Sequence, residues 1–98
     1  MLSVQVKNAR GEVLRKIAAD PGFEPVLLGV DAAVHPHLAV LDPYGDTVFN
    51  YLQVKRLLLE LDTYGPASGA PEAFLEELRQ LCRLVLDGTH RFLWFIGS

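Results

Sequence analysis

The chain has little cysteine and lacks the short motifs on which many cofactor and nucleophile sites are built. Its single cysteine, Cys82, cannot form an internal disulfide, and a zinc site of the CxxC type is excluded. No GxGxxG or GxxxxGKS/T loop is present to bind nucleotide phosphates. Ser68 lies in GPASG, but Pro66 occupies the position of the first glycine in the GxSxG nucleophile elbow. We therefore expect no catalytic residue and no cofactor.

Long hydrophobic runs and dense basic stretches are also missing. The longest apolar run, FLWFI at 92–96, has five residues, whereas a membrane span needs ~20. Residues 1–16 carry a net charge of +3 and the remainder −6. Basic residues are therefore too few and too scattered to bind a nucleic-acid phosphate backbone. The first residues lack the basic-then-apolar pattern of a signal peptide. We expect a cytoplasmic protein that binds neither membranes nor nucleic acid.

Apolar residues are plentiful for a chain of this size. Half of the 98 residues are hydrophobic, and the mean hydropathy is +0.21. A chain of this length forms one domain, spanning residues 1–98, and has a small interior relative to its surface. The excess of apolar residues over interior volume indicates that some apolar surface is shared with another chain.

The spacing of apolar residues predicts a single α+β domain. Alternation and short apolar runs between turn residues predict strands at 2–7, 13–18, 37–41, 47–50 and 90–96. Helical spacing predicts helices at 51–64 and 71–87, while 20–25 reads as a loop and 26–33 as either a short helix or a loop. The predicted order β-β-β-β-α-α-β favours one mostly antiparallel sheet of about five strands, with two helices packed on one face.

The first predicted helix is apolar on two sides. Its main stripe consists of Val54, Leu57, Leu58, Leu61 and Tyr64. Leu52 and Leu59 project from the opposite side, where they either pack against the second helix or a loop, or form a seam for another subunit. The second predicted helix has one apolar stripe, formed by Phe74, Leu75, Leu78, Leu81, Cys82 and Val85. The sequence leaves both readings of the Leu52 and Leu59 seam open.

The stretch DPYGDTVFN at 42–50 predicts a rigid turn followed by a strand. Asp42, Pro43 and Gly45 occupy the positions that a type I turn prefers, because proline presets φ and the aspartate side chain bonds the following backbone N–H groups. Tyr44 then lies at the tip of the turn, where an exposed aromatic ring makes a good contact residue. We expect Tyr44, with Asp46 beside it, to contact a partner.

The histidines and aspartates of this region suggest an alternative metal site. His35 and His37 form an HxH pair, and on a strand both imidazoles would face the same way. With Asp42 and Asp46 they could form the ligand set of a small metal-dependent enzyme. Pro36 between the histidines instead favours two loop residues at a strand entrance. We therefore assign no metal ligand, and keep the metal-dependent enzyme as an alternative function.

The pattern DPYGDTVFN, followed later by FLWFIG, resembles small bacterial proteins of about this length. The resemblance covers residues 38–58 and 90–97 best, and residues 2–18 loosely. It implies a stand-alone α+β domain and brings neither an activity nor catalytic residues.

These observations lead to a hypothesis about function. We expect a non-enzymatic protein-interaction module of the immunity, inhibitor or adaptor type, which contacts its partner through Tyr44, Asp46, Leu52 and Leu59. We also expect a homodimer, since Leu52 and Leu59 offer a seam that a two-fold axis can bury against its own copy. The alternatives are the metal-dependent enzyme described above and a homo-oligomeric scaffold subunit.

Overall fold

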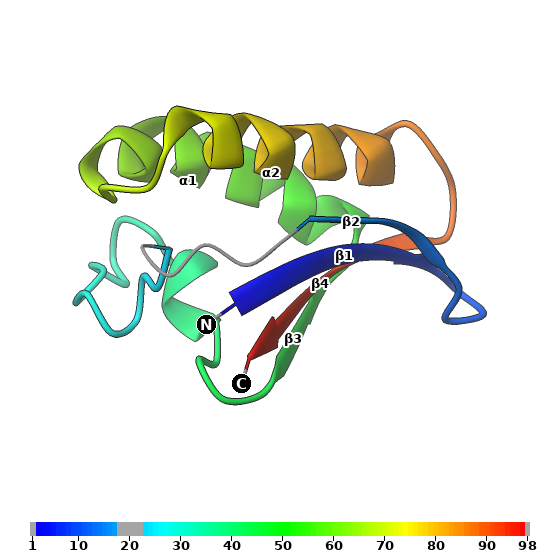
Figure 1. The fold of residues 1–98 in the computed structure, drawn as a ribbon, viewed down its shortest axis with the longest axis horizontal. Coiled ribbons are helices and arrows are strands. Elements are labelled where there is room, and N and C mark those ends of the chain that lie inside the picture. Colours follow the sequence, from blue (N-terminus) through cyan, green and yellow to red (C-terminus); the bar gives the residue numbers. More distant parts are fainter. Residues whose placement is uncertain (1, 18–22, 98) are drawn as a thin grey trace.

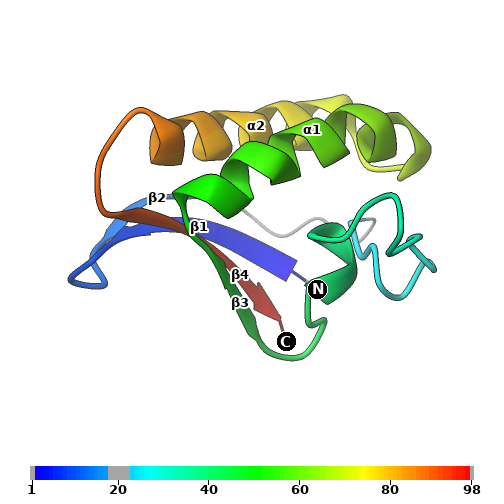
Figure 2. The same ribbon diagram turned by 180° about the vertical axis from the view of Figure 1, so that it is seen from behind.

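An antiparallel sheet and two helices form the two layers of the fold (Figure 1). This computed structural model describes residues 2–17 and 23–97. The strands are β1 (Leu2–Asn8), β2 (Val13–Ile17), β3 (Asp46–Phe49) and β4 (Arg91–Gly97). The helices are α1 (Tyr51–Ala67) and α2 (Glu72–Leu86), and both lie on the same side of the sheet (Figure 2). The predicted α+β class is confirmed.

The strands follow the order β2-β1-β4-β3 across the sheet, and every neighbouring pair is antiparallel. β4, the last strand of the chain, is therefore central, between β1 and β3. Alternation along β1 places Val4 opposite Phe95 in the register with β4, and both side chains face the helices. The described part of the chain holds four strands, so the prediction of five is wrong by one.

The missing strand is the one expected at 37–41, where the chain instead forms a short 3₁₀ helix, η1 (Leu38–Val40). Glu60 of α1 explains the difference, because its carboxylate accepts hydrogen bonds from the backbone N–H groups of His37, at 2.9 Å, and Leu38, at 3.1 Å. These two donors at the start of η1 would otherwise be unsatisfied. Leu38 and Leu41 still reach the core, so the apolar run was read correctly as buried but wrongly as a strand.

The connection before η1 is built from turns. Leu28 N–H donates to the carbonyl of Glu24, and Val30 N–H donates to that of Pro25, with Gly29 at a positive φ of 77°. The helix considered for residues 26–33 does not form, because Gly29 takes a left-handed conformation that ends any helical turn. Residue 18 of the predicted second strand and residues 20–22 of the predicted loop lie outside the described residues.

Side-chain caps define both ends of α1. The Asn50 side chain accepts from the backbone N–H of Gln53, and the Gln53 side chain accepts from that of Asn50, forming a capping box. The helix continues three residues beyond its predicted end at Tyr64 and includes Pro66 in its last turn. Ser68 then ends it, because its hydroxyl donates to the carbonyl of Gly65 at 2.7 Å.

The core lies between the sheet and the helices. All six stripe residues of α2 are buried, as predicted, and so are four of the five stripe residues of α1, with Leu58 packed at the edge of the core. From the sheet come the side chains that alternate toward the helices: Leu2, Val4, Val6, Ile17, Phe49, Leu93 and Phe95. Phe23 closes one end of this core through ring contacts with Tyr64 and Phe74.

Candidate functional site

The sheet has a second face, directed away from both helices, which we call the open face (Figure 1). Its side chains alternate with those of the core, because Gln5 pairs with Trp94 in the register next to the buried pair Val4 and Phe95. By the same alternation the open face consists of Ser3, Gln5, Lys7, Val13, Lys16, Asp46, Val48, Phe92, Trp94 and Ile96. Helices cover one side of this sheet, and its other side carries two aromatic rings.

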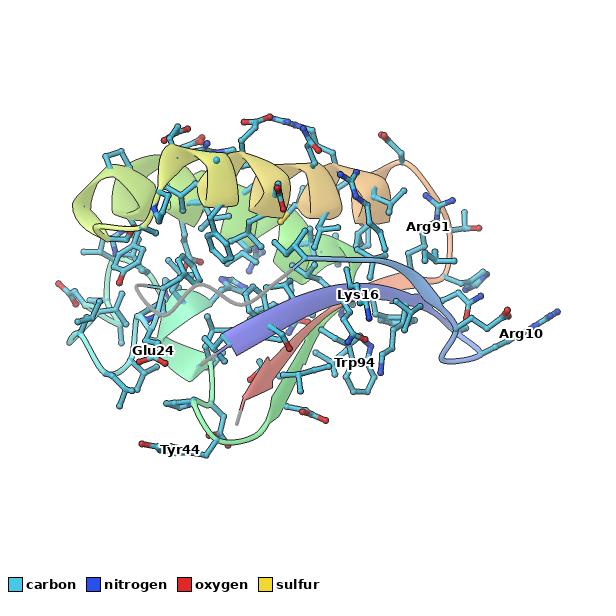
Figure 3. The ribbon with its side chains drawn as sticks, in the orientation of Figure 1. Arg10, Lys16, Glu24, Tyr44, Arg91 and Trp94 are labelled. Carbon is cyan, nitrogen blue, oxygen red and sulfur yellow. The ribbon has the colours of Figure 1, made fainter. Side chains whose placement is uncertain are left out.

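Trp94 lies at the centre of the open face. Val48 of β3 lies directly opposite it in the register and is 41% exposed. The ammonium of Lys7 lies over the indole ring, 4.1 Å from its centroid, in a cation–π contact. Figure 3 shows Trp94 and Lys16 projecting from the sheet on the side away from the helices. The face therefore places positive charge beside an aromatic surface.

Two hollows occur on this side of the sheet. The first has a volume of about 250 Å³ and is lined by Val48, Phe92 and Trp94 together with the β1–β2 turn residues Asn8, Ala9 and Gly11. The second, of about 410 Å³, is lined by Ser3, Gln5, Lys16 and Ile17. The first hollow is mainly apolar, and the second includes a lysine. The pairing of β4 places Phe92 and Trp94 on the open face, while Leu93 and Phe95 of the same apolar run face the core.

The turn that begins at Asp42 has the predicted geometry. The Asp42 carboxylate accepts from the backbone N–H of Tyr44 at 2.9 Å, and the Asp42 carbonyl accepts from Gly45 N–H at 3.4 Å. The carbonyl of Gly45 in turn accepts from Gly97 N–H, which holds the turn against the end of β4. Tyr44 is 76% exposed and points away from the molecule (Figure 3). Asp46 lies on the open face, opposite Ile96.

Leu52 and Leu59 lie on the outer side of α1. Their side chains are 66% and 69% exposed. The connecting segment, in its described part 23–36, leaves both side chains exposed and is therefore not a loop that covers them. It packs against the other end of α1, where His35 Nε2 lies 2.8 Å from the Thr63 hydroxyl and its ring contacts Tyr64.

His35 and His37 do not form a pair on a strand, since the expected strand is replaced by η1. The ring of His37 instead contacts Glu60, with Nδ1 2.5 Å from Oε2, and Glu60 is only 7% exposed. The two histidines thus fasten the connection before η1 to α1, at Thr63 and at Glu60. Sequence reasoning missed Glu60, because an acidic residue inside a predicted helix gives no sign of a distant backbone partner.

The remaining side chains that could bind a metal or react are those of His, Cys, Asp and Glu. Within residues 2–17 and 23–97, no group of three or more His, Cys, Asp or Glu side chains is arranged to hold a metal ion. Asp42 accepts a hydrogen bond within its own turn, and His37 contacts Glu60. The candidate ligands therefore have different partners. Burial raises the pKa of the Cys82 thiol to about 12, which keeps it protonated and unreactive at neutral pH.

Comparisons of the chain with protein families, with curated proteins and with solved structures find no match. None of the helices in the described ranges is long and apolar enough to cross a membrane. The geometry of the open face and of α1 is therefore the basis for the functional proposal.

Proposed function

We propose that the protein is a non-enzymatic protein-interaction module of the inhibitor or adaptor kind, which binds a partner protein on its open face. The observation that carries the proposal is the placement of Val48, Phe92 and Trp94 around a hollow on a sheet face that the helices leave uncovered. Apolar and aromatic residues gathered in one place on a surface are typical of binding sites. Tyr44 and Asp46 extend this surface at the turn before β3.

The placement of the reactive groups supports a binding role over a chemical one. Glu60 and His37 are engaged with each other, and the Glu60 carboxylate also accepts from two backbone N–H groups. Asp42 stabilises its own turn, and Cys82 is buried as a thiol of raised pKa. Each of these groups has a structural task that accounts for its position. We place the protein in the cytoplasm, where a chain with one cysteine suits the reducing conditions.

We further propose that the protein forms a homodimer through α1. Leu52 and Leu59 are two helical turns apart and therefore lie on one side of the helix, with more than half of each side chain exposed. A two-fold axis would bury both leucines against the same pair on the second copy. This contact uses the outer side of α1, so it leaves the open face free for a partner.

The test of the main proposal is affinity capture from a lysate of the source cells with four baits. Mass spectrometry identifies the proteins that each bait retains. The baits are the wild-type protein, Val48→Glu on the open face, Leu52→Glu with Leu59→Glu on α1, and the control Val40→Glu. Val40 is 60% exposed and belongs to η1, so its variant makes the same chemical change away from the open face.

We expect a partner that the wild-type and Val40→Glu baits retain and that Val48→Glu loses. A partner lost only by the α1 variant would move the binding surface to the helix and overturn the open-face assignment. Retention of every captured protein by all four baits would overturn the interaction-module proposal. Circular dichroism of each bait ensures that a loss of binding is not a loss of fold.

A further inference from the structure

We propose that the open face binds an acidic segment of its partner, which inserts one bulky apolar side chain into the hollow beside Trp94 and places a carboxylate on Lys7. This inference rests on the proposed function and specifies the chemistry of the partner. It follows from three features of the open face: an apolar hollow, a cation on one of the aromatic rings that line it, and a positive charge balance.

The hollow suits a single large side chain. Its walls are the side chains of Val48, Phe92 and Trp94 on one side and the β1–β2 turn on the other, and its volume is about 250 Å³. Gly11 of this turn has a positive φ of 83°, a conformation that glycine adopts without strain and that shapes the turn. Asn8 fixes the same turn, because its side-chain oxygen accepts from the backbone N–H groups of Arg10 and Glu12 at 3.0 Å. The walls are therefore largely formed before a partner binds.

Lys7 is the cation next to the hollow: it does not line the hollow itself, but it contacts the lining residue Trp94. Because its ammonium lies 4.1 Å from the centroid of Trp94, and Trp94 lines the hollow, a ligand side chain in the hollow has Lys7 beside it. An ammonium held on an indole ring keeps further hydrogen-bonding capacity for a carboxylate. The expected ligand therefore has an acidic residue close to its apolar residue.

The charge balance of this region is opposite to that of the whole chain. The open face carries Lys7, Lys16 and Asp46, and the hairpin next to it carries Arg10 and Glu12. This region therefore has three basic and two acidic side chains. The chain as a whole has a net charge of −3, so positive charge is concentrated on this side. Complementary charge raises the association rate and excludes basic partners.

A single-stranded nucleic acid is the competing ligand for an aromatic and basic sheet face. Two observations favour the acidic protein segment. Lys7 already covers the ring of Trp94 on which a base would stack. The local excess of positive charge, three basic against two acidic residues, suits one carboxylate and is too small for the many phosphate contacts that a polyanion needs for affinity.

The experiment selects binders from a random peptide library displayed on phage, with the full chain as the target. Trp94 is the only tryptophan of the chain, so its fluorescence reports directly on the hollow. Selected peptides, synthesised without tryptophan, are titrated against the wild-type protein, Lys7→Glu and the control Lys55→Glu. Lys55 of α1 lies over the ring of Tyr51, so its variant makes the same charge reversal at a comparable contact elsewhere. A poly-uridine oligonucleotide is titrated in parallel.

We expect the selected peptides to share an apolar residue next to Asp or Glu and to shift the emission of Trp94. Lys7→Glu should weaken binding by about tenfold or more, while Lys55→Glu stays near the wild-type value. Basic or uncharged consensus peptides, or equal loss in both variants, would overturn the inference, as would tighter binding of poly-uridine. If the captured partner depends on Val48 but the peptides are not acidic, only this inference fails; if capture ignores Val48, the proposed function fails.

Discussion

Large apolar side chains occupy two regions of this molecule, the interior layer and the outer surface, and the regions differ in how they are surrounded. In the interior, Leu93 and Phe95 are fully buried between the sheet and the helices. On the outside, Leu59 is 69% exposed and Tyr44 76%. The same residue types therefore serve stability in one region and are available for contacts in the other. The apolar excess of the chain is exposed on β2 and β3, along the connection 26–40, at the turn and on α1.

The sharpest test of this difference is the same substitution in both regions. Leu93→Ala should lower the free energy of unfolding by about 2–5 kcal/mol, because it leaves a cavity in the packed interior. Leu59→Ala should change it by less than about 0.5 kcal/mol, since the side chain is mostly in water. Urea denaturation followed by circular dichroism measures both. A loss at Leu59 as large as that at Leu93 would show that the outer leucine is part of the core.

The second test concerns a polar group that lies inside. Glu60→Gln should lower the free energy of unfolding by about 1–3 kcal/mol, because the amide group would face donors that the carboxylate now satisfies. The matched control is Glu77→Gln, an exposed residue of α2, which should be close to neutral. Denaturant unfolding of the three proteins distinguishes them. Equal stability of both variants would show that Glu60 does not hold η1 against α1.

The third test distinguishes the residue that stabilises the turn, Asp42, from the residue at its tip, Tyr44. Asp42→Ala removes the oxygen that accepts from Tyr44 N–H and should destabilise the fold by roughly 0.5–2 kcal/mol. Asp42→Asn keeps a side-chain oxygen and should be milder. Tyr44→Ala should leave stability nearly unchanged and weaken binding of the partner. Thermal unfolding of the three variants ranks their stabilities. If Tyr44→Ala unfolds the protein, the Tyr44 ring lies in the interior.

The fourth test expects a change of assembly without a change of stability. Light scattering coupled to size-exclusion chromatography should show a dimer for the wild-type protein, against a single-chain mass of 10.9 kDa. Leu52→Glu with Leu59→Glu should give that single-chain mass while circular dichroism stays unchanged, because charge on both leucines opposes their burial. A wild-type mass of one chain at every practical concentration contradicts the dimer, and loss of fold in the variant would assign the two leucines to the interior.

The smallest expected effect is that of added metal. Calorimetric titration with zinc, manganese or calcium should show no stoichiometric binding at submicromolar affinity, because His37 contacts Glu60 and Asp42 holds its turn. Binding that His35→Ala or His37→Ala abolishes would support the metal-dependent enzyme instead.

Patterns that depend on neighbouring residues were predicted well from the sequence. The buried stripe of α2 and the turn at Asp42 are examples, because helical spacing and local side-chain bonds are visible in a short stretch. The end of α1 was less predictable, since Pro66 is accommodated in the last turn of a helix closed by Ser68.

Features that depend on distant residues were not predictable in this way. An apolar run as short as 38–41 suits a strand or a helical turn equally, and Glu60 of α1 decides between them. Phe92 and Trp94 alternate with Leu93 and Phe95, but the alternation alone does not say which face the helices cover. The helices on the Leu93 side make the other side the open face.

The central position of β4 also governs the order in which the fold can assemble. The β1–β2 hairpin needs only local contacts, whereas β3 pairs with β4 and has no direct pairing with β1 in the sheet. The two outer parts of the sheet are therefore paired only through residues 91–97, which also bring Leu2 beside Gly97. Long-range pairings of this kind slow folding, so we expect the docking of β4 to be the slow step. A chain that stops before Arg91 would lose the only strand that pairs with both β1 and β3 in the described sheet.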